Sequence, residues 1–148
     1  MSKKHLGKVT QLFISLKTSS QRVNKSSIIL DELGIKDDKY HHTNIQRSVL
    51  ITSLSSYTLA KEHGITMPLG SLGENLLIDY NPYTLSTGSK LGIGTAILEI
   101  SQNCTMCNHL SQIDVQLPIL LKNDRGIFAK VIQEGEIKND DEIYLIHQ

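Results

Sequence analysis

Short runs of apolar residues, separated by turn residues, recur along almost the whole chain. From Gly7 to Leu16 the apolar side chains follow a pattern compatible with a β-strand. The later runs are short enough to be strands, and Gly, Pro, Asn and Asp stand between them. We therefore predict further strands at Ile28–Leu30, Val49–Ile51, Asn75–Ile78, Ser89–Ile93, Ala96–Ile100, Gly126–Ile132 and Glu142–Ile146.

One segment, from about Leu54 to His63, has the start, the apolar side and the end of a helix. Thr52 or Ser53 can cap its N-terminus, and Gly64 can adopt the left-handed conformation that ends many helices. Many short strands with one clear helix are typical of a mainly β protein. We expect one or two short helices and a partly closed β-barrel or sandwich.

The chain has the length of one ordinary domain. Its 148 residues contain no repeat or Pro-rich linker, so we expect a single domain over residues 1–148. The stretch from Lys17 to Ser27 is rich in Lys, Ser and Thr, and we predict a surface loop there.

Charge and hydropathy argue against two classes of partner. Lys plus Arg and Asp plus Glu both number 15, so no net field attracts nucleic acid or anionic lipid. The apolar stretch behind the basic N-terminus is interrupted by polar residues. A signal peptide and a membrane helix both need an unbroken apolar run, so the sequence predicts neither. We expect a cytoplasmic protein that binds neither nucleic acid nor membrane.

Cys104, Cys107 and His109 form the densest group of reactive side chains. They resemble half of a zinc site, which His41 and His42 would have to complete from a distant segment. They also fit a dithiol redox pair, although no thioredoxin-like pattern surrounds them. Either cysteine can instead be a small buried hydrophobe. The residues alone leave these alternatives open.

Two other polar segments and one arginine are candidates for ligand binding. The segment from Asp37 to Arg47 offers histidines for proton transfer and an arginine for oxyanions. The segment from Gly70 to Asn75 lacks the residues of a phosphate-binding loop, so its glycines are expected to set a turn. Glu74 or Asn75 would then hydrogen-bond buried backbone. Arg125 precedes a strand and fits the mouth of a pocket.

Read together, these pieces resemble the MOSC family, named for the C-terminal domain of molybdenum cofactor sulfurase. The order and spacing of the pieces carry the resemblance, which spans most of the chain. The pieces are Gly7–Val9, Gly34–Arg47, Gly70–Leu76, Leu85–Gly88, Leu91–Gly94, Leu98–Gln102, Cys107, Arg125–Val131 and Gly135–Ile137, followed by Asp140 and Asp141. The resemblance implies a MOSC-like partly closed β-barrel.

The resemblance also selects between the two cysteines. The family pattern places its cysteine after a Thr/Ser-Gln pair and four further residues, and Ser101-Gln102 puts that cysteine at Cys107. It implies that Cys107 carries sulfur as a persulfide or contacts the molybdenum of the cofactor. Cys104 is then a bystander or at most a resolving thiol. His41 or His109 would move a proton.

The implied ligand is the molybdenum cofactor, with its anionic phosphate held by arginine. The expected cofactor-binding residues are Arg47, Arg125, Glu74 and Asn75. Sulfur would come from a partner such as a cysteine desulfurase, which would carry the pyridoxal phosphate, since 148 residues leave no room for that domain. A molybdoenzyme or an electron-transfer protein is a further implied partner. Sulfur transfer and a role in a reductase system both stay open, as does a small-molecule binding barrel in which Cys107 merely lines the pocket.

Two positions depart from the family pattern. The family often has Gly-Asp before its histidine, where this chain has Asp37-Asp38, and often has proline or an acidic residue before its cysteine, where this chain has Met106.

Overall fold

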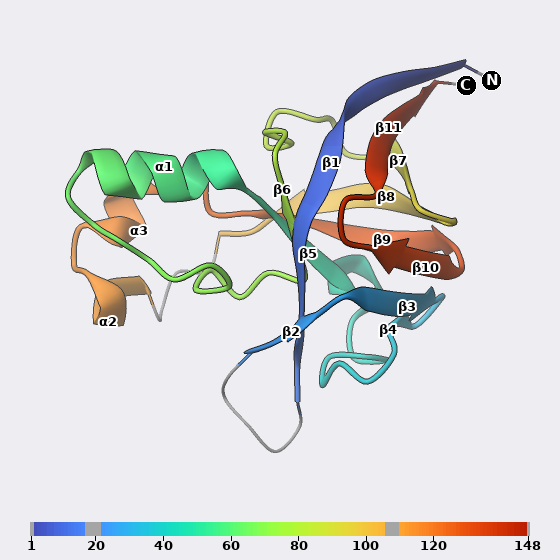
Figure 1. The fold of residues 1–148 in the computed structure, drawn as a ribbon, viewed down its shortest axis with the longest axis horizontal. Helices are drawn as coiled ribbons and strands as arrows, with labels where there is room; N and C mark the ends of the chain where they lie inside the picture. The colour runs from blue at the N-terminus through green and yellow to red at the C-terminus, as the bar shows by residue number, and fades with distance from the viewer. Residues whose placement is uncertain (1, 17–21, 106–109, 148) are drawn as a thin grey trace.

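Seven strands form a sheet that closes on itself into a barrel (Figure 1). The computed structural model describes residues 2–16, 22–105 and 110–147. The barrel strands are β1 (Ser2–Ser15), β5 (Val49–Ser53), β6 (Leu76–Ile78), β7 (Lys90–Ile93), β8 (Ala96–Asn103), β9 (Ile127–Gln133) and β11 (Glu142–His147). Their order is β11-β7-β8-β9-β5-β6-β1, and β1 pairs back with β11. This confirms the predicted mainly β class and barrel.

Strand β2 (Arg22–Lys25) extends the sheet beside the second half of β1. Its residues pair with Leu12–Ser15 in an antiparallel register. The prediction of a surface loop from Lys17 to Ser27 is therefore wrong for this part, while residues 17–21 lie outside the described residues. Val23 is the one apolar residue of β2, so pairing with β1 forms the strand without an apolar pattern.

A second, three-stranded sheet packs beside the barrel. It contains β10 (Gly135–Lys138), β3 (Ser27–Asp31) and β4 (Gly34–Ile35), in that order. The sequence pattern does not predict β4 or β10, which have two and four residues. A single 3-10 turn, η1 (Ile45–Arg47), precedes β5.

Alternation along the strands separates two apolar clusters. In β6, Leu76 and Ile78 belong to the cluster that fills the barrel, while Leu77 between them packs toward the helices. In β1, Leu12 and Phe13 divide in the same way. Apolar side chains thus occupy the barrel interior, so a bound ligand has to sit outside it.

The helices cover the outer face of the barrel that Leu77 and Phe13 present. They are α1 (Leu54–Glu62), α2 (Leu110–Ile113) and α3 (Leu117–Leu120). The predicted helix is confirmed as α1: Ser53 caps it through its side chain, and Gly64 has a φ of 80°. α1 is the crossover that the parallel pairing of β5 with β6 requires.

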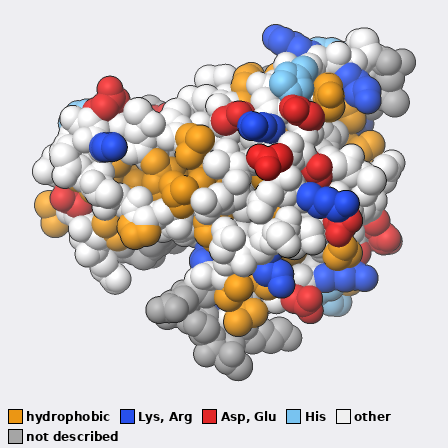
Figure 2. Space-filling view, in the orientation of Figure 1, with side chains coloured by type: hydrophobic (Ala, Val, Ile, Leu, Met, Phe, Trp, Pro, Cys, Tyr) orange, Lys and Arg blue, Asp and Glu red, His pale blue; other side chains and the backbone are white. Residues whose placement is uncertain are grey.

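The face drawn in Figure 2 shows how side chains are distributed over these layers. Hydrophobic side chains gather over the helices, whereas acidic and basic groups are interspersed over the barrel and the small sheet. The mixture of signs agrees with the formal net charge of zero. Within the described ranges, no helix has the length and apolar character needed to cross a membrane.

The junction of the small sheet with the barrel depends on Gly135. A Cβ at this position would lie 2.5 Å from the carbonyl carbon of Thr95 and 2.6 Å from the backbone nitrogen of Ala96. Backbone atoms can give way only by shifting the strands. We expect Gly135→Ala to lower the free energy of unfolding by about 1–3 kcal/mol, measured by urea denaturation.

Gly92→Ala is the matched control for this prediction. Gly92 lies in β7, and a Cβ there would make ordinary contact, 3.4 Å from Cδ1 of Ile146. Its free energy of unfolding should change by no more than about 1 kcal/mol. Equal losses in the two variants would contradict a steric role for Gly135.

Candidate functional site

A pocket of about 450 Å³ opens beside the barrel where β8 ends and β9 begins. Two loops, residues 36–48 and 70–75, form much of its wall together with the starts of β2, β5 and β9. The lining includes Arg22, Arg47, Arg125, Asn75, Cys104 and Phe128. Its volume suits a small-molecule ligand.

The sequence contains only three arginines, and all three line this pocket. Among the described residues no lysine lines it, although lysine is much the commoner cation in the sequence. Guanidinium groups bind oxyanions through a planar fork of N–H donors, which an ammonium group lacks. The segregation of arginine into one pocket points to a planar or tetrahedral oxyanion as its ligand.

Backbone carbonyls and an aromatic ring hold the three guanidinium groups. Nη1 of Arg125 donates to the carbonyl of Leu72 at 2.5 Å, and Nη1 of Arg22 donates to the carbonyl of Glu74 at 3.0 Å. The guanidinium carbon of the exposed Arg47 lies 4.4 Å from the ring centre of Phe128. Within the described part of the chain, none of the three forms an ion pair with a carboxylate.

Arg125 is the most deeply placed of these cations. It is 4% exposed, and its Nε has no hydrogen-bond partner among the described residues. An unpaired donor in a buried guanidinium is costly unless a ligand accepts its hydrogen bond. This orphaned donor supports the interpretation of the pocket as an anion site.

Two buried carboxylates, Asp38 and Glu74, partly offset the positive charge from a distance. Burial lowers the pKa of Arg22, while both carboxylates raise it and Arg125 lowers it. The ordinary pKa of arginine is so far above neutrality that the group keeps its charge despite this lowering. Three cations therefore face two anions, and the excess positive charge favours an anionic ligand.

Tyr57 on α1 fixes the shape of the loop at residues 70–75. Its hydroxyl accepts hydrogen bonds from the backbone nitrogens of Gly70 at 3.1 Å and Leu72 at 3.4 Å. It donates to Oε2 of Glu74 at 2.5 Å, and Thr52 donates to the same oxygen at 2.7 Å. Burial and the charge of Glu74 raise the pKa of Tyr57 well above its usual range, which keeps the hydroxyl a donor.

The glycines of this loop set a turn, as the sequence predicts. Gly70 and Gly73 have φ values of 95° and 82°, which glycine adopts without strain. Asn75 hydrogen-bonds buried backbone: its side chain accepts from the nitrogen of Leu50 at 3.0 Å and donates to the carbonyl of Phe13 at 3.2 Å. Asn75 thus lines the pocket, and its amide ties the pocket wall to β5 and β1.

Glu74, also expected to bind the cofactor, lies beneath the pocket wall instead of on it. Its side chain is fully buried, and Oε1 has no partner among the described residues. Its contacts with Thr52 and Tyr57 make it a support for the loop, whose carbonyls orient Arg22 and Arg125.

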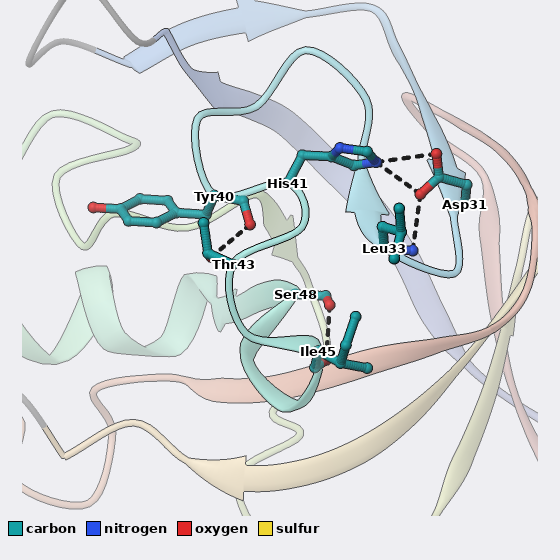
Figure 3. A network of polar contacts seen from close by, with 7 residues as sticks. All are labelled: Asp31, Leu33, Tyr40, His41, Thr43, Ile45 and Ser48. Carbon is teal, nitrogen blue, oxygen red and sulfur yellow. Dashed lines mark hydrogen bonds and ion pairs between the residues drawn. The ribbon is translucent and has the colours of Figure 1, made fainter.

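The loop at residues 36–48 turns His41 away from the pocket. In Figure 3, His41 points to Asp31 at the end of β3, while Tyr40, a pocket-lining residue, projects from the other side of the loop. Nε2 of His41 lies 2.8 and 3.0 Å from the two carboxylate oxygens of Asp31. His41 therefore anchors this loop to the small sheet, and its predicted proton transfer stays a prediction.

The position where the family often has glycine adopts a glycine-like conformation here. Asp37 has a φ of 71°. Aspartate tolerates the left-handed region better than most residues. The following Asp38 accepts hydrogen bonds from the backbone nitrogens of Ser15 at 2.7 Å and Tyr40 at 3.0 Å, which ties the loop to β1.

Only one of the two cysteines, Cys104, is among the residues that the structure describes. Cys107 and His109 lie outside the described residues. Cys104 lines the pocket, is 5% exposed and packs against Leu50 and Phe128. Among the described residues no group of three or more His, Cys, Asp or Glu side chains has the placement of a metal site. The zinc alternative, which needs Cys107 and His109, stays untested.

Sequence reasoning missed three residues of this site. Arg22 stands in a stretch whose composition indicates a loop, and Tyr57 faces the core from a helix like any buried aromatic residue. Cys104 is only a bystander or at most a resolving thiol in the resemblance, because the family pattern selects Cys107. No local signal in the sequence marks the first two, because only the fold brings Arg22 to the pocket and Tyr57 to the loop at residues 70–75.

Comparison with known proteins identifies relatives by sequence profile and by fold. The MOSC domain profile matches residues 38–144. The crystal structure of YuaD from Bacillus subtilis superposes with a TM-score of 0.79 at 18% identity, covering 99% of both chains. YiiM from Escherichia coli has a TM-score of 0.67 at 19% identity, covering 95% of this chain and 70% of its own. At these identities the likeness shows a shared fold. No curated protein matches the sequence.

YiiM from Geobacillus stearothermophilus gives the same result at lower identity. Its crystal structure has a TM-score of 0.67 at 14% identity, covering 99% of this chain and 76% of its own.

Removing the Tyr57 hydroxyl should destabilise the loop at residues 70–75. Tyr57→Phe removes one of the two donors to Oε2 of Glu74 and leaves the backbone donors of Gly70 and Leu72 without their acceptor. Hydrogen bonds to charged groups contribute about 1.5–3 kcal/mol. We expect a loss of that size in the free energy of unfolding, measured in urea. Tyr80→Phe, which removes a hydroxyl away from this network, is the control and should change little.

The hydrogen-bonded contact between Asp31 and His41 should stabilise the protein in a pH-dependent way. Burial raises the pKa of Asp31, but hydrogen bonds from His41 and Leu33 lower it more, so the net pKa lies below its ordinary 3.8. A depressed folded-state pKa contributes stability above the ordinary value, and this is lost as the pH falls through the folded-state value.

Asp31→Asn should therefore lower Tm at pH 7 by an amount that corresponds to a loss of about 1 kcal/mol in the free energy of unfolding. At pH 3 the difference in Tm between the variant and the unsubstituted protein should be smaller. Thermal unfolding at the two pH values measures both differences. Glu32→Gln, at a neighbouring exposed carboxyl group, is the control. A Tm difference for Asp31→Asn that is equal at pH 7 and pH 3 would rule out the electrostatic origin.

Proposed function

Because the chain belongs to the MOSC domain family, we propose that it binds the molybdenum cofactor in the arginine pocket and carries sulfur on Cys107. The family is associated with the molybdenum cofactor and with sulfur carriers of its sulfurase systems. The observation that carries the proposal is the gathering of all three arginines of the sequence around one pocket.

The donors of the pocket fit the phosphate of this cofactor. Arg125 has a buried Nε without a partner among the described residues, and Arg47 presents an exposed guanidinium group. Arg22, the third cation, adds a donor that the sequence did not single out. The volume of about 450 Å³ lies in the range of small-molecule sites. When bound, the cofactor would supply a molybdenum centre, and its anionic phosphate would be held by the arginines.

Cys107 acts in this proposal as a thiolate. A thiolate is both the nucleophile in sulfur transfer and the form that binds metals. It attacks the terminal sulfur of a persulfide on the donor protein. A bond forms between Cys107 and that sulfur, the S–S bond of the donor breaks, and the donor leaves as a thiolate. His41 and His109 remain proposed proton carriers for this step.

The donor in this proposal is a separate protein such as a cysteine desulfurase, which would hold the pyridoxal phosphate. The acceptor is a molybdoenzyme or an electron-transfer partner. The family membership supports a link to sulfurase systems, and the specific partners belong to the proposal.

A direct test is intact-mass spectrometry of the protein purified without reductant. We expect additional mass from sulfur or a bound pterin, and we expect the sulfur to be absent from Cys107→Ser. Cys104→Ser is the matched control and should keep the Cys107 sulfur. Equal sulfur uptake by Cys107→Ser and the unsubstituted protein would exclude Cys107 as the carrier, and a pocket in which Cys107 merely lines the wall would then be favoured.

The anion-binding part is tested separately by calorimetric titration with inorganic phosphate. Arg47→Gln removes an exposed cation with little expected effect on folding, and it should weaken binding about 10-fold or more. Lys122→Gln removes one positive charge from an exposed position outside the pocket and should leave the affinity nearly unchanged. Equal weakening in both variants would indicate a general charge effect instead of a pocket.

A further inference from the structure

Cys104 is the pocket residue that the proposed function does not use. It follows the last residue of β8, and its backbone nitrogen donates to the carbonyl of Gly126 at 3.0 Å. It packs against Phe128, the same ring on which the Arg47 guanidinium lies. The backbone hydrogen bond fixes its place at the end of β8, and both Cys104 and Arg47 contact the Phe128 ring.

Cys104 is only 5% exposed, but it lines a pocket that contains all three arginines of the sequence. Reactive cysteines occur in electropositive and partly accessible surroundings, whereas structural cysteines sit among apolar groups alone. Cys104 has apolar contacts on one side and the arginine pocket on the other.

An independent observation points to a ligand at the same place. Arg125 lines the pocket, is 4% exposed, and has an Nε donor without a partner among the described residues. An oxyanion bound there would satisfy this donor and would lie in the cavity that Cys104 also lines. The thiol and the anion site thus share one volume of about 450 Å³.

We propose that Cys104 is a second reactive thiol of the arginine pocket, which reacts with small anionic electrophiles that the guanidinium groups hold. The proposal rests on the anion-binding part of the proposed function and is independent of the role of Cys107. The substrate class is a small molecule with an oxyanion group next to an electrophilic carbon or sulfur. The arginines bind the oxyanion, and the thiolate attacks the electrophilic atom.

Iodoacetate is a suitable probe because it combines a carboxylate with an electrophilic carbon, and iodoacetamide is its neutral counterpart. In the reaction, the thiol proton goes to water, the sulfur of Cys104 forms a bond to the methylene carbon, and the carbon–iodine bond breaks to release iodide. The two reagents differ mainly in charge. Their rate ratio therefore reports the influence of the pocket on the thiol.

The experiment compares the two rates at Cys104 in the full chain at neutral pH. Peptide mapping separates adducts at Cys104 from adducts at Cys107. The variant Cys107→Ser removes the second thiol, so that only Cys104 can form an adduct. We expect the ratio of the iodoacetate rate to the iodoacetamide rate to exceed that of free N-acetylcysteine by about 10-fold. Arg47→Gln should return the ratio toward the free value, Lys122→Gln should not, and inorganic phosphate should protect Cys104.

Two results would overturn the inference. Alkylation of Cys104 only after denaturation would mean that the thiol is a packing residue. A ratio equal to that of the free thiol, unchanged in Arg47→Gln, would mean an accessible thiol outside the influence of the arginines. If phosphate still binds and Arg47→Gln still weakens it, the anion pocket stands while the Cys104 inference fails. If phosphate does not bind, the proposed cofactor site fails as well.

Discussion

The pairing of β1 with three other strands is the constraint on which the rest of the structure depends. Its first half pairs with β11 and closes the barrel, its middle pairs with β6, and its end pairs with β2. Gly7 permits this course, because a Cβ there would lie only 2.3 Å from Oδ1 of Asp79. Without that side chain, Asp79 can accept the backbone N–H of Lys8 at 2.8 Å. The β2 pairing then brings Arg22 to the pocket.

The path from this constraint to the pocket runs through backbone groups more than through side-chain pairs. Once the barrel is closed, α1 lies over Leu77, and Tyr57 can reach the loop at residues 70–75. The loop in turn directs the carbonyls of Leu72 and Glu74 at Arg125 and Arg22. A carbonyl orients a guanidinium group without neutralising it, as a carboxylate in direct contact would. Orientation and retained charge are both needed for an anion site.

Much of the fold was predictable, because apolar residues alternate with polar ones in a strand that has one buried face. Each predicted strand overlaps a strand of the structure, and Ser53 and Gly64 mark both ends of α1. The sequence did not predict β2, where pairing replaces an apolar pattern. The site was predictable in part: Arg47, Arg125 and Asn75 line the pocket, while His41 and Glu74 support it from outside. A sequence pattern names residue types, and only the fold decides which side of a loop each occupies.

The buried carboxylates explain why the pocket can keep its charge in a folded protein. The carboxylate of Asp38 accepts hydrogen bonds from the backbone nitrogens of Ser15 and Tyr40. Oε2 of Glu74 accepts hydrogen bonds from the hydroxyl groups of Thr52 and Tyr57. Both act on Arg22 through space, which limits the cost of burying that cation. Neither neutralises the guanidinium groups by contact, because hydrogen bonds direct them to other partners. An incoming anion would therefore meet guanidinium groups that form no ion pair among the described residues, and one of them, Arg125, has an Nε donor without a partner there. Binding would then not require existing ion pairs to break.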